Sequence, residues 1–389
     1  MPFSNCLTRR DAMKLALAAG ASATAFGGAS SALAAGTVNF ADIGVGDPGG
    51  DWSRYTKASG YNVNLVSIGN APSAILNVLL AGGGTGTYDI INIVGGMQKP
   101  LVDNNLIEEL DTSKMPNWAK NKNIGEFLGK GSPGFNFIGY NDKIYGCPTV
   151  LQGDSFAYLP EKTGPLDSYA ALFDPKFKGY VALEDNYTTA AAKTALYLKA
   201  AGKADIKNPD DMTADEFKKV IDFLIEQKKA GQFRVIWSSF QQAVDLIVNK
   251  EVYVIDCWEP MVFVAKSKGV DAVYADPKEG YLLWAMAAYI VKNPKRTPEQ
   301  TAAAYQLLDF MLGGWYGAKI TSSRGYMTNT DAPDYAKAHA DEFKGDEAAK
   351  VSSITENVRK KFAKGGTWQN RWPTVVDVYE AEWSRFKSA

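Results

Sequence analysis

Histidine is almost absent from this chain of 389 residues, since His339 is the only one. Zinc sites and histidine-based catalytic triads depend on imidazole, so we expect neither of them, and we expect no catalytic residue or bound metal. The formal net charge is −1, and no block of five or more basic residues occurs. Phosphate binding needs clustered Lys and Arg, so nucleic acid is not an expected partner.

Cysteine is also scarce, with three residues in the whole chain. Cys6 lies near the N-terminus, which leaves Cys147 and Cys257 in the body of the protein. An oxidising compartment would permit these two to pair, and buried free thiols are the alternative. The sequence does not supply the geometry that a disulfide requires, so both possibilities stay open here. No cysteine spacing typical of a metal site is present.

Long hydrophobic runs are missing, because no segment reaches about 18 consecutive apolar residues. The N-terminus instead carries Arg9-Arg10, a stretch of small apolar residues over 15–27, and Ala32-Leu33-Ala34. Paired arginines, a short apolar stretch and a small-x-small cleavage pattern predict a twin-arginine export signal over residues 1–35. A short membrane anchor is the alternative. We therefore expect a periplasmic mature protein.

Strand and helix patterns alternate along the rest of the chain. Strands are predicted at 37–40, 62–66, 88–93, 180–183, 252–255 and 283–291, and helices at 51–59, 71–80, 190–200 and 297–312, with a further helix opening at the capping box of Thr213 and Glu216. This alternation is typical of an α/β fold with mostly parallel sheets. The glycine-rich run 82–86 lacks the ending of a phosphate-binding loop, so we interpret it as a turn and expect no cofactor.

Aromatic residues are plentiful, with nine Trp and nineteen Tyr. Trp258 follows a predicted strand, Trp284 begins another, Tyr326 sits beside Gly325, and Gln369 follows Trp368 in a predicted turn. Open α/β sheets bind ligands at the carboxyl ends of their strands, and aromatic faces there can attract a cation. Core packing is the alternative for any single ring.

Several segments, in order along nearly the whole mature chain, resemble the spermidine/putrescine-binding family of periplasmic receptors. The similar segments are Tyr88-Asp89-Ile90-Ile91, Ile144-Tyr145-Gly146-Cys147-Pro148, Leu172-Phe173-Asp174-Pro175-Lys176-Phe177-Lys178-Gly179, Glu279-Gly280 before Trp284, Gly325-Tyr326, and Trp368-Gln369-Asn370.

This resemblance implies a two-lobe periplasmic-binding-protein fold of type II, in which each lobe is a mostly parallel sheet flanked by helices. Crossing hinge segments near Cys147-Pro148, Trp284 and Tyr326 would join the lobes. The first lobe would comprise residues 36–147 and about 285–325, and the second would comprise 148–284 and about 326–389. A small polar, amine-containing ligand would be buried by hinge closure. The expected partners are that ligand and the inner-membrane permease of an ABC importer, with the receptor acting as a monomer.

The resemblance places Trp258, Trp284, Tyr326 and Gln369 against the ligand. By the same resemblance the family's acidic positions in this region are replaced, with Asn186, Thr189 and Met286 where carboxylates are usual and Val94 where polar residues follow the strand. A buried amine without a carboxylate partner is costly, so other acids must compensate. The candidates are Asp42, Asp154, Asp185 and Glu259. Polyamine-like, amino acid-like and quaternary amine ligands all stay open.

Two other functions are weighed against transport. The first is a periplasmic sensor subunit, which would report the ligand to a membrane receptor. The second is an exported enzyme using Glu184-Asp185 or Asp256/Glu259 as an acid/base pair. No nucleophile–base motif supports catalysis, so we predict binding.

Overall fold

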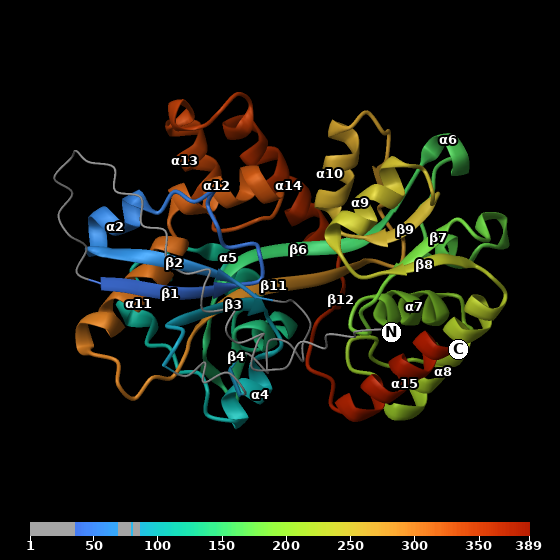
Figure 1. The fold of residues 1–389 in the computed structure, drawn as a ribbon, viewed down its shortest axis with the longest axis horizontal. Coiled ribbons are helices and arrows are strands. Elements are labelled where there is room, and N and C mark those ends of the chain that lie inside the picture. The colour runs from blue at the N-terminus through green and yellow to red at the C-terminus, as the bar shows by residue number, and fades with distance from the viewer. Residues whose placement is uncertain (1–35, 69–78, 81–85) are drawn as a thin grey trace, which may run out of the picture. The chain divides into compact units, whose positions relative to one another are not determined.

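Two long antiparallel strands cross the centre of a sheet of ten strands in the computed structural model, which describes residues 36–68, 79–80 and 86–389. These crossing strands are β6 (Gly146–Tyr158) and β11 (Tyr281–Ile290), and every residue in both is buried. They lie side by side in Figure 1, with Leu282 opposite Asp154 and Trp284 opposite Gln152. The described residues all belong to one compact unit, residues 34–389.

The two ends of this sheet form the centres of two lobes, in the order β2-β1-β3-β11-β6-β9-β7-β8. The first lobe carries the parallel strands β1 (Gly36–Asp42), β2 (Tyr61–Ser67) and β3 (Ile90–Val94). The second carries the parallel strands β7 (Val181–Glu184), β8 (Phe233–Trp237) and β9 (Val254–Cys257). β11 joins β3 and β6 joins β9, so the mixed α/β, two-lobe fold predicted from the sequence is confirmed.

Short strands and single turns complete the connections. These are β4 (Gly139–Tyr140), β5 (Lys143–Ile144), β10 (Val273–Tyr274), β12 (Gly366–Trp368), η1 (Thr112–Lys114), η2 (Pro133–Phe137), η3 (Tyr169–Phe173), η4 (Pro175–Phe177) and η5 (Ala340–Glu342). β12 pairs with the start of β11 and so brings the segment that follows it, including Gln369, to the crossing strands.

Helices flank the sheet in both lobes (Figure 1). The helices of the first lobe and its neighbourhood are α2 (Ser53–Ser59), α4 (Gln98–Asp103), α5 (Lys122–Phe127), α11 (Pro298–Met311), α12 (Gly314–Arg324), α13 (Ala332–Ala338) and α14 (Glu347–Lys364). Those around the second lobe are α6 (Pro160–Thr163), α7 (Ala190–Ala200), α8 (Ala214–Lys229), α9 (Phe240–Val248), α10 (Glu259–Ser267) and α15 (Val376–Ser388). α8 begins with the predicted capping box, in which Thr213 and Glu216 bond each other's backbone N–H groups.

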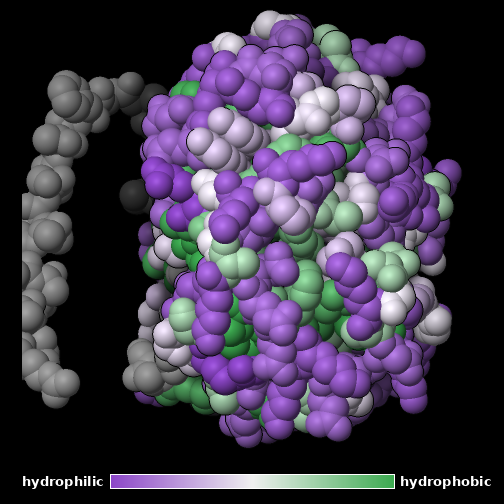
Figure 2. Space-filling view, turned by 90° about the vertical axis from the view of Figure 1, so that its right-hand side faces the viewer, coloured by the Kyte–Doolittle hydropathy of each residue, from purple (hydrophilic) through white to green (hydrophobic). Residues whose placement is uncertain are grey.

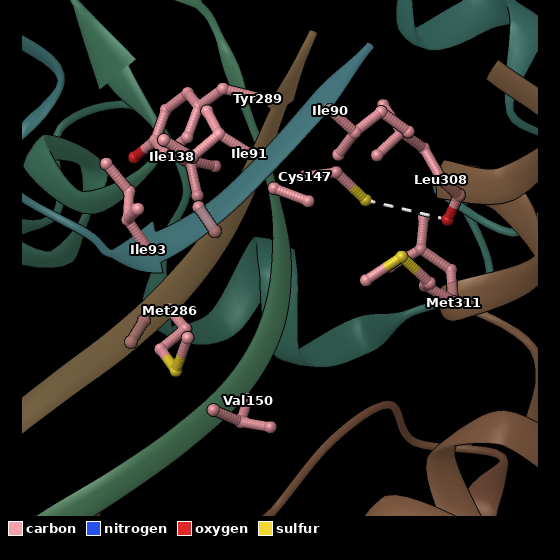
Figure 3. Close-up of a cluster of buried hydrophobic side chains, with 14 of the residues drawn as sticks. Ile90, Ile91, Ile93, Ile138, Cys147, Val150, Met286, Tyr289, Leu308 and Met311 are labelled. Atoms are coloured by element: carbon pink, nitrogen blue, oxygen red, sulfur yellow. Dashed lines mark hydrogen bonds between the residues drawn. The ribbon is translucent and has the colours of Figure 1, made fainter. Parts of the chain in front are cut away.

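The largest hydrophobic core fills the first lobe and surrounds the crossing strands. Figure 3 shows isoleucines of β3 packed with Met286 and Tyr289 of β11. Val358 and Phe362 of α14 belong to this same core, so packing alone places α14 with the first lobe. Two further cores lie in the second lobe, one against α7, α8 and α15 and one against α9 and α10. The lobe boundaries given from the sequence remain a prediction.

The outer face of the second lobe is mainly hydrophilic. Figure 2 views the end of this unit that carries α6, β7 and β8, where hydrophobic side chains show only between polar ones. Within the described part of the chain, no helix combines the length and the hydrophobicity needed to cross a bilayer. The predicted export signal at residues 1–35, nearly all of the predicted helix at 71–80 and all but the last residue of the glycine run 82–86 lie outside the described residues.

Cys147 and Cys257 are free thiols, and both are fully buried. Cys147 lies in the first-lobe core, where its Sγ is 3.7 Å from the carbonyl oxygen of Leu308 (Figure 3). Cys257 belongs to the core beneath α9 and α10. The alternative of a disulfide left open by the sequence is therefore not the arrangement in this structure.

We expect neither thiol to react with a water-soluble disulfide reagent in the native mature protein. Burial raises the pKa of both thiols, which keeps them protonated, and it also blocks access. Absorbance of the released reagent should report no thiol before unfolding and two afterwards. A melting temperature that falls when a reductant is added would instead reveal a bridge between them.

Candidate functional site

A cavity of about 100 Å³ lies where the crossing strands meet both lobes, and we call it the inner cavity. Its lining residues come from strand ends and from the loops that follow them. They are Ile43, Val45, Val94, Asp154, Glu184, Asn186, Thr189, Trp258, Trp284, Met286, Tyr326, Gln369 and Asn370. Parallel strands bring such end loops to one edge of a sheet, which is the usual ligand-binding edge of α/β folds.

Three aromatic rings form walls of the inner cavity. Trp284 and Tyr326 meet edge to face, with ring centroids 5.3 Å apart. Trp258 is half-buried and is held at 77° against the buried ring of Trp237, with centroids 5.7 Å apart. Edge contacts of this kind fix ring orientation, so these three residues give the cavity aromatic walls of defined orientation.

Tyr326 is fixed to the crossing strand β6 by its chain neighbours. Met327 and Leu151 form an isolated bridge, in which each backbone N–H donates to the other's carbonyl oxygen at 3.1 and 2.7 Å. The Gln152 side-chain Nε2 also donates to the carbonyl oxygen of Gly325 at 3.0 Å. These bonds hold the segment around Tyr326 on the strand that carries Asp154.

Asp154 is a buried carboxylate with one free oxygen. Its Oδ2 accepts a hydrogen bond of 2.6 Å from Gln369 Nε2. Asp154 Oδ1, Gln369 Oε1 and Trp284 Nε1 are all buried, and none has a hydrogen-bond partner among the described residues. Leaving such groups unsatisfied costs about 1–3 kcal/mol each, so a polar ligand that reaches them gains that energy back.

Burial raises the pKa of Asp154 above its ordinary value, although the positive charge of Lys193, the nearby indole N–H of Trp284 and the hydrogen bond from Gln369 act in the opposite direction. A cation placed in the inner cavity would favour the ionised form of this carboxyl group.

Glu184 ends strand β7 and supplies a second carboxyl group. Its Oε2 accepts hydrogen bonds from Thr189 Oγ1 at 2.8 Å and from Trp258 Nε1 at 3.2 Å. Burial raises the pKa of Glu184 to about 8, and the nearby charge of Asp256 adds to this effect. The empty site therefore holds a proton at Glu184 near neutral pH.

A fully buried ion pair lies behind these two carboxyl groups. Lys193 of α7 donates to Asp256 of β9, and neither side chain is exposed. Burial lowers the pKa of Lys193, but the negative charges of Asp256, Asp154 and Glu184 outweigh it, so the net shift is upward. The direct partner of Lys193 is Asp256. Among the described residues, no other lysine or arginine forms an ion pair with Asp154 or Glu184. The inner cavity is therefore suited to a positively charged group.

Four of the predicted site residues meet at this cavity, namely Trp258, Trp284, Tyr326 and Gln369. The substituted positions Asn186, Thr189, Met286 and Val94 line it as well. Asp154, which the sequence offered only as a possible compensating acid, also lines the inner cavity.

The other three predicted carboxylates do not line the inner cavity. Asp185 turns toward α15, where it accepts a hydrogen bond from Trp383 and pairs with Lys387. Glu259 is buried in an ion pair of 2.7 Å with Lys361. Asp42 accepts hydrogen bonds from Asn92 and from the backbone of Gly44 and Gly46, and so it shapes the loop that carries Ile43 and Val45.

Sequence reasoning missed Glu184 and Asn370 as cavity residues. Glu184 was considered only together with Asp185 as an acid/base pair, yet their side chains point to different surroundings. The end of strand β7 at Glu184 was the available signal, because the last residue of such a strand faces the binding edge.

Two lobes with a shared, partly unsatisfied polar cavity define a ligand-binding protein. A family model described as "Bacterial extracellular solute-binding protein" matches residues 53–351, well over half of the chain. The chain belongs to this family of bacterial extracellular solute-binding proteins.

Named relatives agree with this assignment. The chain is 24% identical over 345 residues to spermidine/putrescine-binding periplasmic protein 1 of Haemophilus influenzae, covering 88% of this chain and 86% of the relative. It is 22% identical over 306 residues to the spermidine/putrescine-binding periplasmic protein of Escherichia coli, covering 78% of each. The resemblance stated from the sequence is thus confirmed.

Solved structures share the fold. The spermidine/putrescine substrate-binding protein PotD of Streptococcus pneumoniae has a TM-score of 0.64 at 15% identity, covering 90% of this chain and 98% of that one. The protein MotA of Agrobacterium tumefaciens, solved with glucopine, has a TM-score of 0.65 at 21% identity, covering 90% and 99%. These relatives and neighbours are solute-binding proteins and not enzymes, as the sequence predicted for this chain.

The pKa of Glu184 leads to a pH prediction for the ligand-free protein. Between its ordinary pKa of 4.5 and about 8, the folded state holds this proton and the unfolded chain does not. Raising the pH through this interval therefore lowers the free energy of unfolding. Glu184→Gln does not titrate, so the melting temperature of the wild type should fall relative to that of the variant from pH 5 to pH 8.5. Glu226→Gln, an exposed site on α8, is the control. A difference between wild type and E184Q that stays constant with pH would contradict the assignment.

Proposed function

We propose that this protein is the periplasmic receptor of an ABC importer and that it captures a small polar ligand containing an amine. The observation that carries the proposal is the pair of carboxyl groups, Asp154 and Glu184, beside three aromatic walls. A buried ammonium group needs a carboxylate partner, and aromatic faces add about 0.5–2 kcal/mol of attraction for a cation.

The arrangement of the inner cavity supports capture by closure of the lobes. Val94 comes from the first lobe, Trp258 and Glu184 come from the second, and Asp154 and Trp284 lie on the crossing strands. A ligand can touch all of these only when the lobes are together, so binding shifts the population toward the closed state. An importer that recognises the closed surface would thereby distinguish loaded from empty receptors.

The names of the relatives support both the proposed role in an ABC importer and the proposed amine group of the ligand. Two curated relatives bind spermidine and putrescine by name, and one structural neighbour is the substrate-binding protein of an ABC transporter. We infer that this chain works with a permease in the inner membrane, as a monomer, after export through the twin-arginine pathway. A sensor subunit that reports the same ligand to a membrane receptor is the second candidate, since the capture step would be identical.

A thermal-shift screen of polyamines, amino acids and quaternary amines tests the ligand class. A ligand that binds only the folded protein raises its melting temperature, by an amount that grows with concentration. We expect at least one amine to do so, and the same ligand should be recovered chemically unchanged. A flat response across all amines would contradict the proposal.

Trp258→Ala should weaken binding of the amine found in that screen by about 1 kcal/mol or more, roughly fivefold or more in Kd. The reason is the loss of an aromatic face and of the hydrogen bond from Trp258 Nε1 to Glu184. Isothermal titration calorimetry measures the change. Trp118→Ala, which removes a half-buried indole that packs on the first-lobe core away from the cavity, is the control. Unchanged affinity in a folded W258A variant would rule out this role.

A further inference from the structure

A second and larger cavity adjoins the inner one. It has a volume of about 790 Å³, and we call it the outer cavity. Both cavities are lined by Ile43, Val45, Trp258 and Tyr326, so these four residues form their common boundary. One ligand passing between Trp258 and Tyr326 could therefore occupy both spaces.

The charges of the two cavities are opposite. The charged residues that line the inner cavity are Asp154 and Glu184, which are both acidic. Those that line the outer cavity are Lys266, Arg324 and Lys350, which are all basic. Lys350 has a partner in Asp346 at 2.8 Å, whereas Lys266 forms no ion pair within the described ranges. A ligand spanning both cavities meets negative charge at one end and positive charge at the other.

Arg324 is unusual among the arginines of the described chain. The six others, which are Arg54, Arg234, Arg296, Arg359, Arg371 and Arg385, each lie within 4.0 Å of a carboxylate oxygen. Arg324 has no acidic partner among the described residues, and its buried Nε has no hydrogen bond there either. A guanidinium group presents five donors that match a carboxylate in a two-point contact. Its unsatisfied state at a cavity wall is the expected state of an anion site before binding.

The backbone around Arg324 holds this site close to the inner cavity. Arg324 is the last residue of α12, and Gly325 follows with φ of +79° before Tyr326. A side chain at 325 would meet the ring of Phe263, since an added Cβ would lie 2.8 Å from its Cε2. Glycine is thus required both by the backbone angle and by the close ring.

We propose that the ligand is a zwitterion of the ω-amino carboxylate class. Its ammonium group lies in the inner cavity against Asp154 and Glu184, its chain passes Tyr326 and Trp258, and its carboxylate binds Arg324. This inference rests on the proposed function and adds the second charge of the ligand. It separates this receptor from one built for a diamine, because a second ammonium group would meet Arg324 and Lys266 instead of an acid.

Matched ligands that differ at one end test the inference. Calorimetry compares ω-amino acids, diamines and monoamines with four to six carbons, for example 4-aminobutanoate, putrescine and butylamine. We expect the best ω-amino acid to bind about tenfold or more tightly than the monoamine of equal length, because a hydrogen-bonded charge contact contributes that much. Equal affinity of the two, or tighter binding of the diamine, would overturn the zwitterion and leave the proposed function standing. Binding of no amine at all would overturn both.

Variants of Arg324 locate the carboxylate contact. Arg324→Gln should remove the advantage of the ω-amino acid over the monoamine while leaving the affinity for the monoamine within about twofold. Retained monoamine binding also shows that the variant is folded. Arg324→Lys should keep part of the advantage, because it keeps the charge but not the two-point geometry. Arg234→Ala, which removes an arginine from an exposed ion pair, is the control and should change neither affinity. An unchanged advantage in R324Q would overturn the inference.

Discussion

The pairing of β6 with β11 is the constraint on which the rest of the structure depends. Each strand is shared, because β11 continues the sheet of the first lobe and β6 continues that of the second. Both strands are buried along their whole length, so their backbone groups must be satisfied by each other and by the flanking strands. The same pairing brings Asp154 and Trp284 to the boundary between the lobes, where a polar ligand can reach them.

The electrostatics of the site depend on which carboxylate pairs with Lys193, the buried lysine of α7. Lys193 neutralises Asp256, and this leaves Asp154 and Glu184 as carboxyl groups without a direct ion pair among the described residues. Removing charge from water is costly, so both groups hold their protons more tightly than usual. The pKa of Glu184 is raised to about 8, so a proton on this group keeps one buried negative charge out of the ligand-free protein near neutral pH.

The sequence predicted regular elements better than it predicted the acidic residues of the site. Strands such as β3 and β9 were predictable because their apolar residues form uninterrupted runs. β6 contains Pro148, Gly153 and several polar residues, so its pattern does not resemble a buried strand, and Asp154 could not be placed. Aromatic residues beside turns drew attention to Trp258, Trp284 and Tyr326, which line the inner cavity, and their contact with a ligand stays a prediction. The carboxylates could not be ranked because their role depends on partners distant in sequence, as Lys387 is for Asp185.

The bridge between Leu151 and Met327 affects which lengths of ligand the site can accept. It ties the segment of Arg324 to the strand that carries Asp154, and the bond from Gln152 to Gly325 reinforces that tie. The contacts of the proposed ligand with Asp154 and with Arg324 would therefore lie on one frame, whereas Glu184 would add its contact from the second lobe. The spacing between Asp154 and Arg324 would already be fixed before the lobes close. It would select ligands by their length, and the second lobe would then close over a ligand of matching length.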